Sequence, residues 1–253
     1  MSVIIMHQKL LTQIAQIQPY PLVFLTISGA HLYGFPSPDS DYDLRGIHIL
    51  PAREIVGLYP VQETIEKSES KEGVLIDLVT HELKKFLTLL LKRNGYVLEQ
   101  LYSPLIVYTT PEHQELKAIA CKCITRNHYY HYLGFAQTQW RLFTKTNVYQ
   151  VKPLLYVYRV LLTGIYLMNT GKIEADLIKL NQEFQLPYLN DLIAQKLAKS
   201  ETSLLQKIDL EFYTQEYQKL QNELKKAFEN SFLPNEPSAK GELNNLLLKL
   251  RLY

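Results

Sequence analysis

The chain has 253 residues, 47% of them hydrophobic, and its formal net charge is +2. This composition suits one large globular domain or two smaller ones. It excludes a disordered chain, a collagen-like chain and a disulfide scaffold, since the two cysteines, Cys121 and Cys123, have a spacing that indicates reduced thiols. Charged residues interrupt the apolar segments before they reach membrane-spanning length, and the N-terminus is a poor signal peptide, so we expect a cytoplasmic protein without a membrane partner.

Residues 1–110 show strand and helix signals together, which predicts an α+β domain. Apolar spacing over residues 3–17 indicates an amphipathic helix. A second helix with an apolar face is predicted over 83–91, with Asn94 and Gly95 at its C-terminal end. Short helices are expected from residue 30 and over 53–58, and strands are expected over 22–27, 41–50, 64–67 and 73–79.

From residue 111 the strand signals stop and helical periodicity takes over, which predicts a separate, all-helical domain over residues 111–253. We find no internal repeat and no low-complexity tract in it. The predicted helices cover 112–124, 126–145, 153–169, 174–184, 188–199, 203–230 and 240–251.

The most informative motif begins directly after the first predicted strand. Ser28 and Gly29 form a turn there, and such a turn offers backbone N–H groups to a phosphate. Asp41 and Asp43 lie one residue apart on the next predicted strand, so their carboxylates point to the same face and can share divalent metal ions. A phosphate-binding turn followed by a carboxylate pair is what nucleotidyl transfer needs.

Two other phosphate or metal motifs are excluded by the residues themselves. A Walker A loop would need Lys after its second glycine, but Phe35 follows Gly34. An EF-hand loop from Asp39 would need Gly and Glu where Leu44 and Leu50 stand. A plain turn built on Pro-Asp-Ser-Asp remains as the alternative interpretation of this segment.

Asp77 is the candidate for a third carboxylate. It lies in the otherwise apolar strand segment 74–79, where a lone carboxylate is costly to bury without a partner. A metal ion beside Asp41 and Asp43 would supply that partner. The alternative is an Asp at the end of a strand that faces solvent or caps the next helix.

Positive charge is concentrated in residues 116–173, which contain no Asp or Glu but eight Lys and Arg residues. This segment predicts an anionic partner, either the phosphates of a nucleotide or a nucleic-acid backbone, and solvated helix faces are the alternative. Tyr129, Tyr130 and Tyr132 lie within it, and aromatic rings between basic groups can stack on the bases of single-stranded RNA.

These motifs resemble the polymerase-beta-type nucleotidyltransferase superfamily. Segments 28–34 and 37–46 are similar to one branch of it, the predicted nucleotidyltransferases associated with RNA ligases. The resemblance covers roughly residues 22–172, and one departure is Ala30, where many members have a second Ser. Further matches to the branch are Asp77, Glu82-Leu83-Lys84-Lys85-Phe86, Asn94, Glu99-Gln100-Leu101, Lys152-Pro153, Tyr156 and Arg159.

The resemblance implies an α+β fold in which a small mixed sheet with flanking helices is followed by an all-helical C-terminal domain. It implies that Asp41 and Asp43 bind two Mg²⁺ (or Mn²⁺) ions. It also implies that Asp77 binds one of these ions and favours deprotonation of the hydroxyl that accepts the nucleotide.

The resemblance also implies phosphate ligands. Ser28 and Gly29 would hold the β- and γ-phosphates of a nucleoside triphosphate, and Lys152 and Arg159 would reach a phosphate from the helical domain. An ordinary helix surface is the alternative role for the last two. Arg45 has two possible roles, neutralising a phosphate or pairing with Asp39.

The leading hypothesis is therefore a Mg²⁺-dependent enzyme that moves a nucleoside monophosphate from an NTP to a hydroxyl and releases pyrophosphate. The basic segment and the branch favour an RNA end as the acceptor, with an RNA ligase as a partner in the same pathway. A small-molecule or protein hydroxyl is the second hypothesis. A non-catalytic nucleotide- or RNA-binding protein, or an antitoxin-like protein, is the third.

Overall fold

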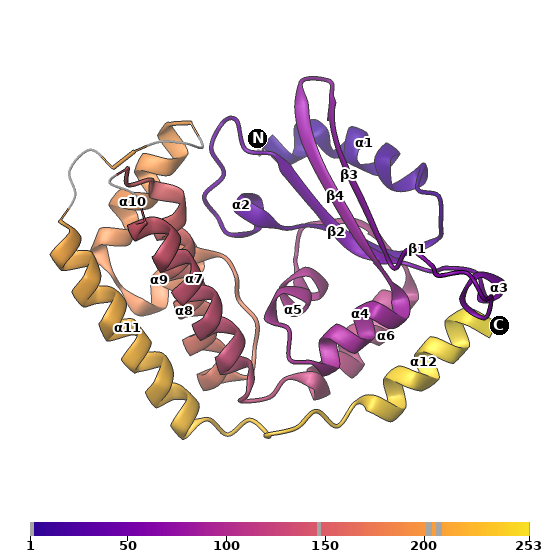
Figure 1. Cartoon of the computed structure of the whole chain (residues 1–253). Coiled ribbons are helices and arrows are strands. Elements are labelled where there is room, and N and C mark those ends of the chain that lie inside the picture. Colours follow the sequence, from indigo (N-terminus) through magenta and orange to yellow (C-terminus); the bar gives the residue numbers. More distant parts are fainter. Residues whose placement is uncertain (1–2, 146–147, 201–203, 206–208, 253) are drawn as a thin grey trace. The chain divides into compact units, whose positions relative to one another are not determined.

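A computed structural model describes residues 3–145, 148–200, 204–205 and 209–252 (Figure 1). The chain divides into two compact units, each formed by segments that are distant in sequence. The first unit contains Met1–Gly29, Asp41–Cys123 and Pro237–Tyr253, and the second contains Ala30–Ser40 and Ile124–Glu236. This division differs from the predicted boundary near residue 110, because helical periodicity shows where helices lie and not which core they pack against.

The first unit is built on a five-stranded sheet with the order β3-β4-β2-β1-β5. β2 and β4 pair in parallel and the other neighbours are antiparallel, so the sheet is mixed, as the resemblance implied. The structure confirms the four predicted strands within a few residues and adds β5, a four-residue strand that was not predicted although its residues Ile, Val, Tyr and Thr all favour strands. The strands are β1 (Leu22–Ile27), β2 (Tyr42–His48), β3 (Thr64–Lys71), β4 (Val74–Glu82) and β5 (Ile106–Thr109).

Helices cover both faces of this sheet. Leu11 and Ile14 of α1 join a core cluster with Leu25 and Ile27 of β1 on one face. Phe24, whose side chain points to the other face, packs edge-on against Phe86 of α4 and stacks on the ring of His113 in α6. The helices here are α1 (Val3–Gln16), α3 (Ala52–Ile55), α4 (Leu83–Leu91), α5 (Gly95–Tyr102), α6 (Pro111–Ala120), the 3₁₀ turn Cys121–Cys123 and α12 (Lys240–Leu252).

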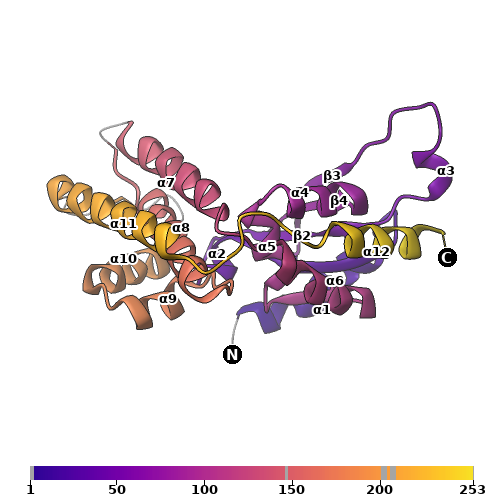
Figure 2. The same cartoon turned by 90° about the horizontal axis from the view of Figure 1, so that it is seen from below.

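Two local predictions in this unit change in detail. Asn94 does not end α4 but begins α5, because its side chain accepts a hydrogen bond from the backbone N–H of Tyr96 at 3.0 Å. The C-terminal helix α12, predicted as part of the helical domain, lies along α4 and α6 of the first unit (Figures 1 and 2). Both cysteines are free thiols.

The second unit is helical and is organised around α8 (Val151–Thr170), which contacts α7 (His128–Thr144), α9 (Leu177–Phe184), α10 (Pro187–Ala198) and α11 (Leu210–Asn230). Within the described residues α8 is the one helix long and apolar enough to cross a membrane, but 78% of its apolar window is buried inside the protein. Burial of this kind is typical of the central helix of a soluble domain. The short helix α2 (Gly29–Leu32) begins at the point where the chain leaves the first unit.

Candidate active site

The turn after β1 brings Gly29 against the carboxylate of Asp43. The backbone N–H of Ser28 donates to the carbonyl oxygen of Asp43 at 2.8 Å, which ties the turn to the start of β2. Gly29 has a φ of +60°, and a Cβ at this position would lie 1.8 Å from Oδ2 of Asp43. The positive φ and the lack of space for a Cβ both require glycine at this position. The turn therefore packs directly against the Asp43 carboxylate.

The hydroxyl of Ser28 is a buried polar group with unused hydrogen-bonding capacity. Within the described part of the chain its Oγ has no hydrogen-bond partner. A buried hydroxyl without a partner costs free energy, and such groups in native proteins call for an explanation. A ligand oxygen at the turn would supply the missing partner.

Asp43 and Asp77 stand side by side on neighbouring strands. They are register partners in the parallel pair β2–β4, so both carboxylates point to the same face of the sheet. The Asp43 side chain is 20% exposed and that of Asp77 is 36% exposed, so both reach the surface. Asp41 lies two residues before Asp43, just outside β2, and is half-buried.

Arg45 lies between these two carboxylates. Its Nη2 donates to Oδ1 of Asp43 at 2.6 Å and to Oδ2 of Asp77 at 2.8 Å. Its Nε donates to the phenol oxygen of Tyr96 at 2.9 Å, and its Nη1 donates to the carbonyl oxygens of Leu44 and Asp77. The structure therefore assigns Arg45, whose role the sequence left open, to the carboxylates of the motif.

The charge on Arg45 is secured by its surroundings. Burial of the guanidinium opposes its charge, but the interactions with Tyr96, Asp43 and Asp77 outweigh burial and raise the pKa of Arg45 above its ordinary value. Tyr96, in the first turn of α5, was not among the residues singled out from the sequence. No local motif marks it, because its contact with Arg45 spans 51 positions of the chain.

The three carboxylates suit a hard divalent cation by their chemistry, since Mg²⁺ and Mn²⁺ prefer oxygen ligands. In the described residues, however, no three Asp, Glu, His or Cys side chains are grouped closely enough to hold a metal ion. The positive charge between Asp43 and Asp77 is that of Arg45. A metal ion at these carboxylates would therefore compete with a cation that belongs to the chain.

Lys152 and Arg159 belong to the second unit, where both lie on α8. Lys152 Nζ is 5.8 Å from the ring centre of Tyr156. Arg159 is 2% exposed, and its guanidinium carbon is 3.9 Å from the ring centre of Tyr33. Because it is buried, Arg159 is not the ordinary surface residue that was its alternative role.

A second buried cation in this unit escaped the sequence analysis. Lys196 of α10 is fully buried, and its Nζ donates to Oγ of Ser37 at 2.6 Å. The Ser37 hydroxyl is in turn 2.9 Å from that of Ser40, so Lys196 helps to fix the loop that precedes the Asp pair in the chain. Its position carried a signal, since Lys196 continues the apolar helical spacing of Leu189 and Ile193.

The aromatic residues of the basic segment are mostly used in packing. Tyr132 is buried, and Tyr129 stacks on Phe228 with ring centres 4.5 Å apart. Trp140 stacks on Tyr217 at 4.3 Å. Tyr130, which is 61% exposed, is the tyrosine of this group that remains open to a base.

Comparison with known proteins identifies the family. The model of the RNA repair pathway DNA polymerase beta family matches residues 3–249. The chain belongs to this family. Nearly all of the chain is covered, so both units are part of the family's common structure.

Two relatives in this comparison carry no assigned activity. The chain is 33% identical over 241 residues to the uncharacterized protein MJ0002 of Methanocaldococcus jannaschii, which covers 91% of this chain and 94% of the relative. It is 28% identical over 260 residues to the uncharacterized protein YcgL of Bacillus subtilis, with 96% and 95% covered. Among solved structures, a nucleotidyltransferase-like protein from Exiguobacterium sibiricum is aligned over 98% of this chain and 80% of its own, at 12% identity and a TM-score of 0.32.

Proposed function

We propose that this member of the family is a Mg²⁺-dependent nucleotidyltransferase, which moves a nucleoside monophosphate from an NTP to a hydroxyl group and releases pyrophosphate. The observation that carries the proposal is the pairing of Asp43 with Asp77 on adjacent strands, directly beside the Gly29 turn. A carboxylate pair alone can bind metal ions, and a glycine turn alone can bind phosphate. Nucleotidyl transfer from a triphosphate needs both at one place.

Each residue then has a role. Asp41, Asp43 and Asp77 would hold Mg²⁺ or Mn²⁺, which when bound neutralises charge on the phosphates. The Ser28 hydroxyl and the Gly29 N–H would donate to the β- and γ-phosphate oxygens. Lys152 and Arg159 stay predicted phosphate ligands.

The reaction itself is a substitution at phosphorus. Asp77 would take the proton of the acceptor hydroxyl, whose oxygen forms a bond to the α-phosphorus. The bond between the α-phosphorus and the oxygen that bridges to the β-phosphorus breaks, and the electron pair leaves with pyrophosphate. Arg45 would hold the carboxylates of Asp43 and Asp77 in place until the site is loaded, because its guanidinium bonds to both.

An RNA end is the acceptor that the family description and the basic segment 116–173 favour. An RNA ligase as a partner in the same pathway and a cytoplasmic location remain predictions. A non-catalytic nucleotide- or RNA-binding protein is the second candidate, because Arg45 already neutralises the carboxylate pair.

The test is a transfer assay with each α-labelled NTP, Mg²⁺ or Mn²⁺, and a pool of small RNAs. We expect label to move to RNA in the natural protein and to fall by at least about a hundredfold in Asp43→Asn, since the variant loses a metal-binding charge. Glu69→Gln, on β3, is the matched control and should keep full activity, because the Glu69 carboxylate pairs with Lys67 at 2.8 Å and not with Arg45. Unchanged transfer in Asp43→Asn would rule out this mechanism, and label on protein or a metabolite would move the acceptor elsewhere.

A further inference from the structure

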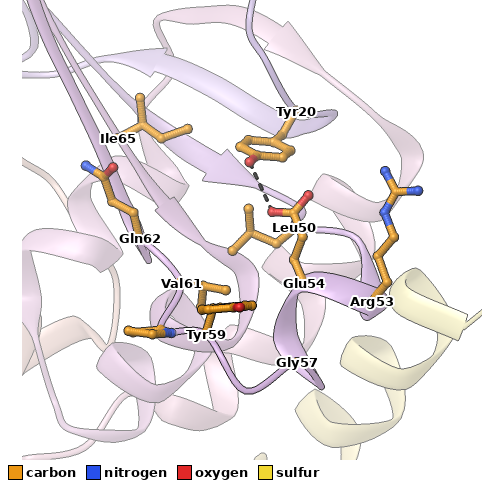
Figure 3. Close-up of a pocket in the computed structure, with 10 residues that line it drawn as sticks. Tyr20, Leu50, Arg53, Glu54, Gly57, Tyr59, Val61, Gln62 and Ile65 are labelled. Carbon is orange, nitrogen blue, oxygen red and sulfur yellow. Dashed lines mark hydrogen bonds between the residues drawn. The ribbon is translucent and has the colours of Figure 1, made fainter.

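A cavity of about 410 Å³ lies in the first unit, beyond the C-terminal end of β2 (Figure 3). Its size is within the range of about 300–1,000 Å³ that is typical of small-molecule sites. Leu50 is one of its lining residues, and it follows Asp43 by seven positions, or about 23 Å of extended chain. The cavity is therefore separate from the carboxylate site on the same unit.

One wall of the cavity is a fixed aromatic ring. The Tyr20 hydroxyl donates to Oε2 of Glu54 at 3.1 Å, as Figure 3 shows, and the Tyr20 ring stacks on His48 with centres 5.7 Å apart. The hydrogen bond with the Glu54 carboxylate raises the pKa of Tyr20, so the phenol keeps its proton. Tyr20 is thus held from two sides while it lines the cavity.

A second aromatic ring lines the same cavity but is open to solvent. Tyr59 is 88% exposed, and within the described residues its ring stacks on no other ring. In the view of Figure 3, Glu54 lies between Tyr20 and Tyr59. A large aromatic side chain held out in water beside a cavity is typical of a surface that binds a flat ligand.

Polar groups around the cavity complement a nucleotide. Arg53 lines it and forms no ion pair with any described residue, so its guanidinium can contact a phosphate. Gln62, whose amide makes no hydrogen bond in the described structure, carries two donors and an acceptor. Glu54 keeps a second carboxylate oxygen for an amino or imino group of a base.

We propose that this cavity holds an unpaired base of a single-stranded RNA. Tyr59 stacks on the base, Arg53 contacts a neighbouring phosphate, and Gln62 and Glu54 contact the base edge. The inference rests on the proposed function in that the strand is the acceptor whose end is modified about 20 Å away. The exposed residues Val56 and Leu58 of the same loop would suit a protein partner, but they do not line the cavity.

The test measures binding of a short labelled single-stranded RNA by fluorescence anisotropy, in EDTA and without NTP. Tyr59→Ala should weaken binding about fivefold to a hundredfold, as expected for the loss of one stacked base, and Tyr59→Phe should restore it. Leu58→Ala is the matched control, because Leu58 is fully exposed on the same loop outside the cavity. It should bind RNA as the natural protein does.

Three outcomes would overturn the inference: equal binding by Tyr59→Ala and the natural protein, an equal loss in Leu58→Ala, or tighter binding of DNA of the same sequence. Failure of the proposed function is visible separately. Asp43→Asn should bind RNA normally, and in an active protein Tyr59→Ala should raise the KM for RNA while kcat is unchanged. RNA binding that depends on Tyr59, without any nucleotidyl transfer, would support this inference and contradict the proposed enzymatic function.

Discussion

The buried guanidinium of Arg45 is shared by two carboxylates, those of Asp43 and Asp77. Without Arg45 the carboxylates would face each other across one strand spacing of about 4.8 Å, and like charges so close repel strongly. Arg45 is 8% exposed, and its remaining N–H groups bond to Tyr96 and to backbone carbonyls, so its position is fixed. The site therefore contains its own counter-ion, and any divalent cation has to compete with it.

Arg45→Met should destabilise the protein by about 3 kcal/mol, because removing one partner leaves two neighbouring carboxylates without compensation. Mn²⁺ should then raise the melting temperature of Arg45→Met by more than it raises that of the natural protein, since the competing cation is gone. Thermal unfolding with Mn²⁺ or EDTA measures both effects. An equal Mn²⁺ shift in the two proteins would show that the metal does not bind where Arg45 lies.

At the scale of elements, β2 and α12 show how distant parts of the chain are joined. β2 carries Asp43 and Arg45 in the middle of the sheet, between β4 and β1, where the strand register decides to which face each side chain points. The last helix, α12, returns to the first unit, where Arg251 donates to the buried carboxylate of Glu82. Glu82 also caps α4 by accepting from the backbone N–H of Lys84 at 2.8 Å, so the pair ties the C-terminal helix to the end of β4.

Arg251→Ala should cost about 3–5 kcal/mol of unfolding free energy, because it leaves a carboxylate that is 2% exposed without its cation. Lys249→Ala is the matched control. It breaks an exposed ion pair on the same helix, between Lys249 and Glu115, which is worth less than about 1 kcal/mol. Urea unfolding of both variants checks the prediction, and equal effects would contradict it.

At the scale of the whole molecule, both units contain histidines whose surroundings favour the neutral ring. In the first unit burial lowers the pKa of His48 and of His113 to about 4, and His113 is further fixed by Thr109 at 2.9 Å. In the second unit burial, aided by the charge of Arg159, lowers the pKa of His131 to about 4. As the pH falls, each of these rings therefore gains its proton more readily in the unfolded chain than in the folded protein.

Stability should therefore fall as the pH falls from about 6.5, the ordinary pKa of histidine, towards 4, because in this range the unfolded chain binds more protons. Above about pH 6.5 the contribution of these histidines is fully present. The urea midpoint measured at about pH 7.5 and about pH 5.5 tests this. His113→Phe should show a smaller pH dependence, and a midpoint that does not change in the natural protein would refute the prediction.

The sequence alone determined most of the local structure and the motif. Four of the five strands, the position of Gly29 and the acids at 41, 43 and 77 follow from apolar periodicity and residue chemistry, which are local properties. Only the tertiary structure decided that Asp43 and Asp77 are register partners and that Arg45 and Tyr96 meet. It alone placed α12 in the first unit and Lys196 against Ser37. These facts join residues separated by 34 to 169 positions. No local pattern reports contacts over such distances, because strand order and helix docking depend on how the whole core is filled.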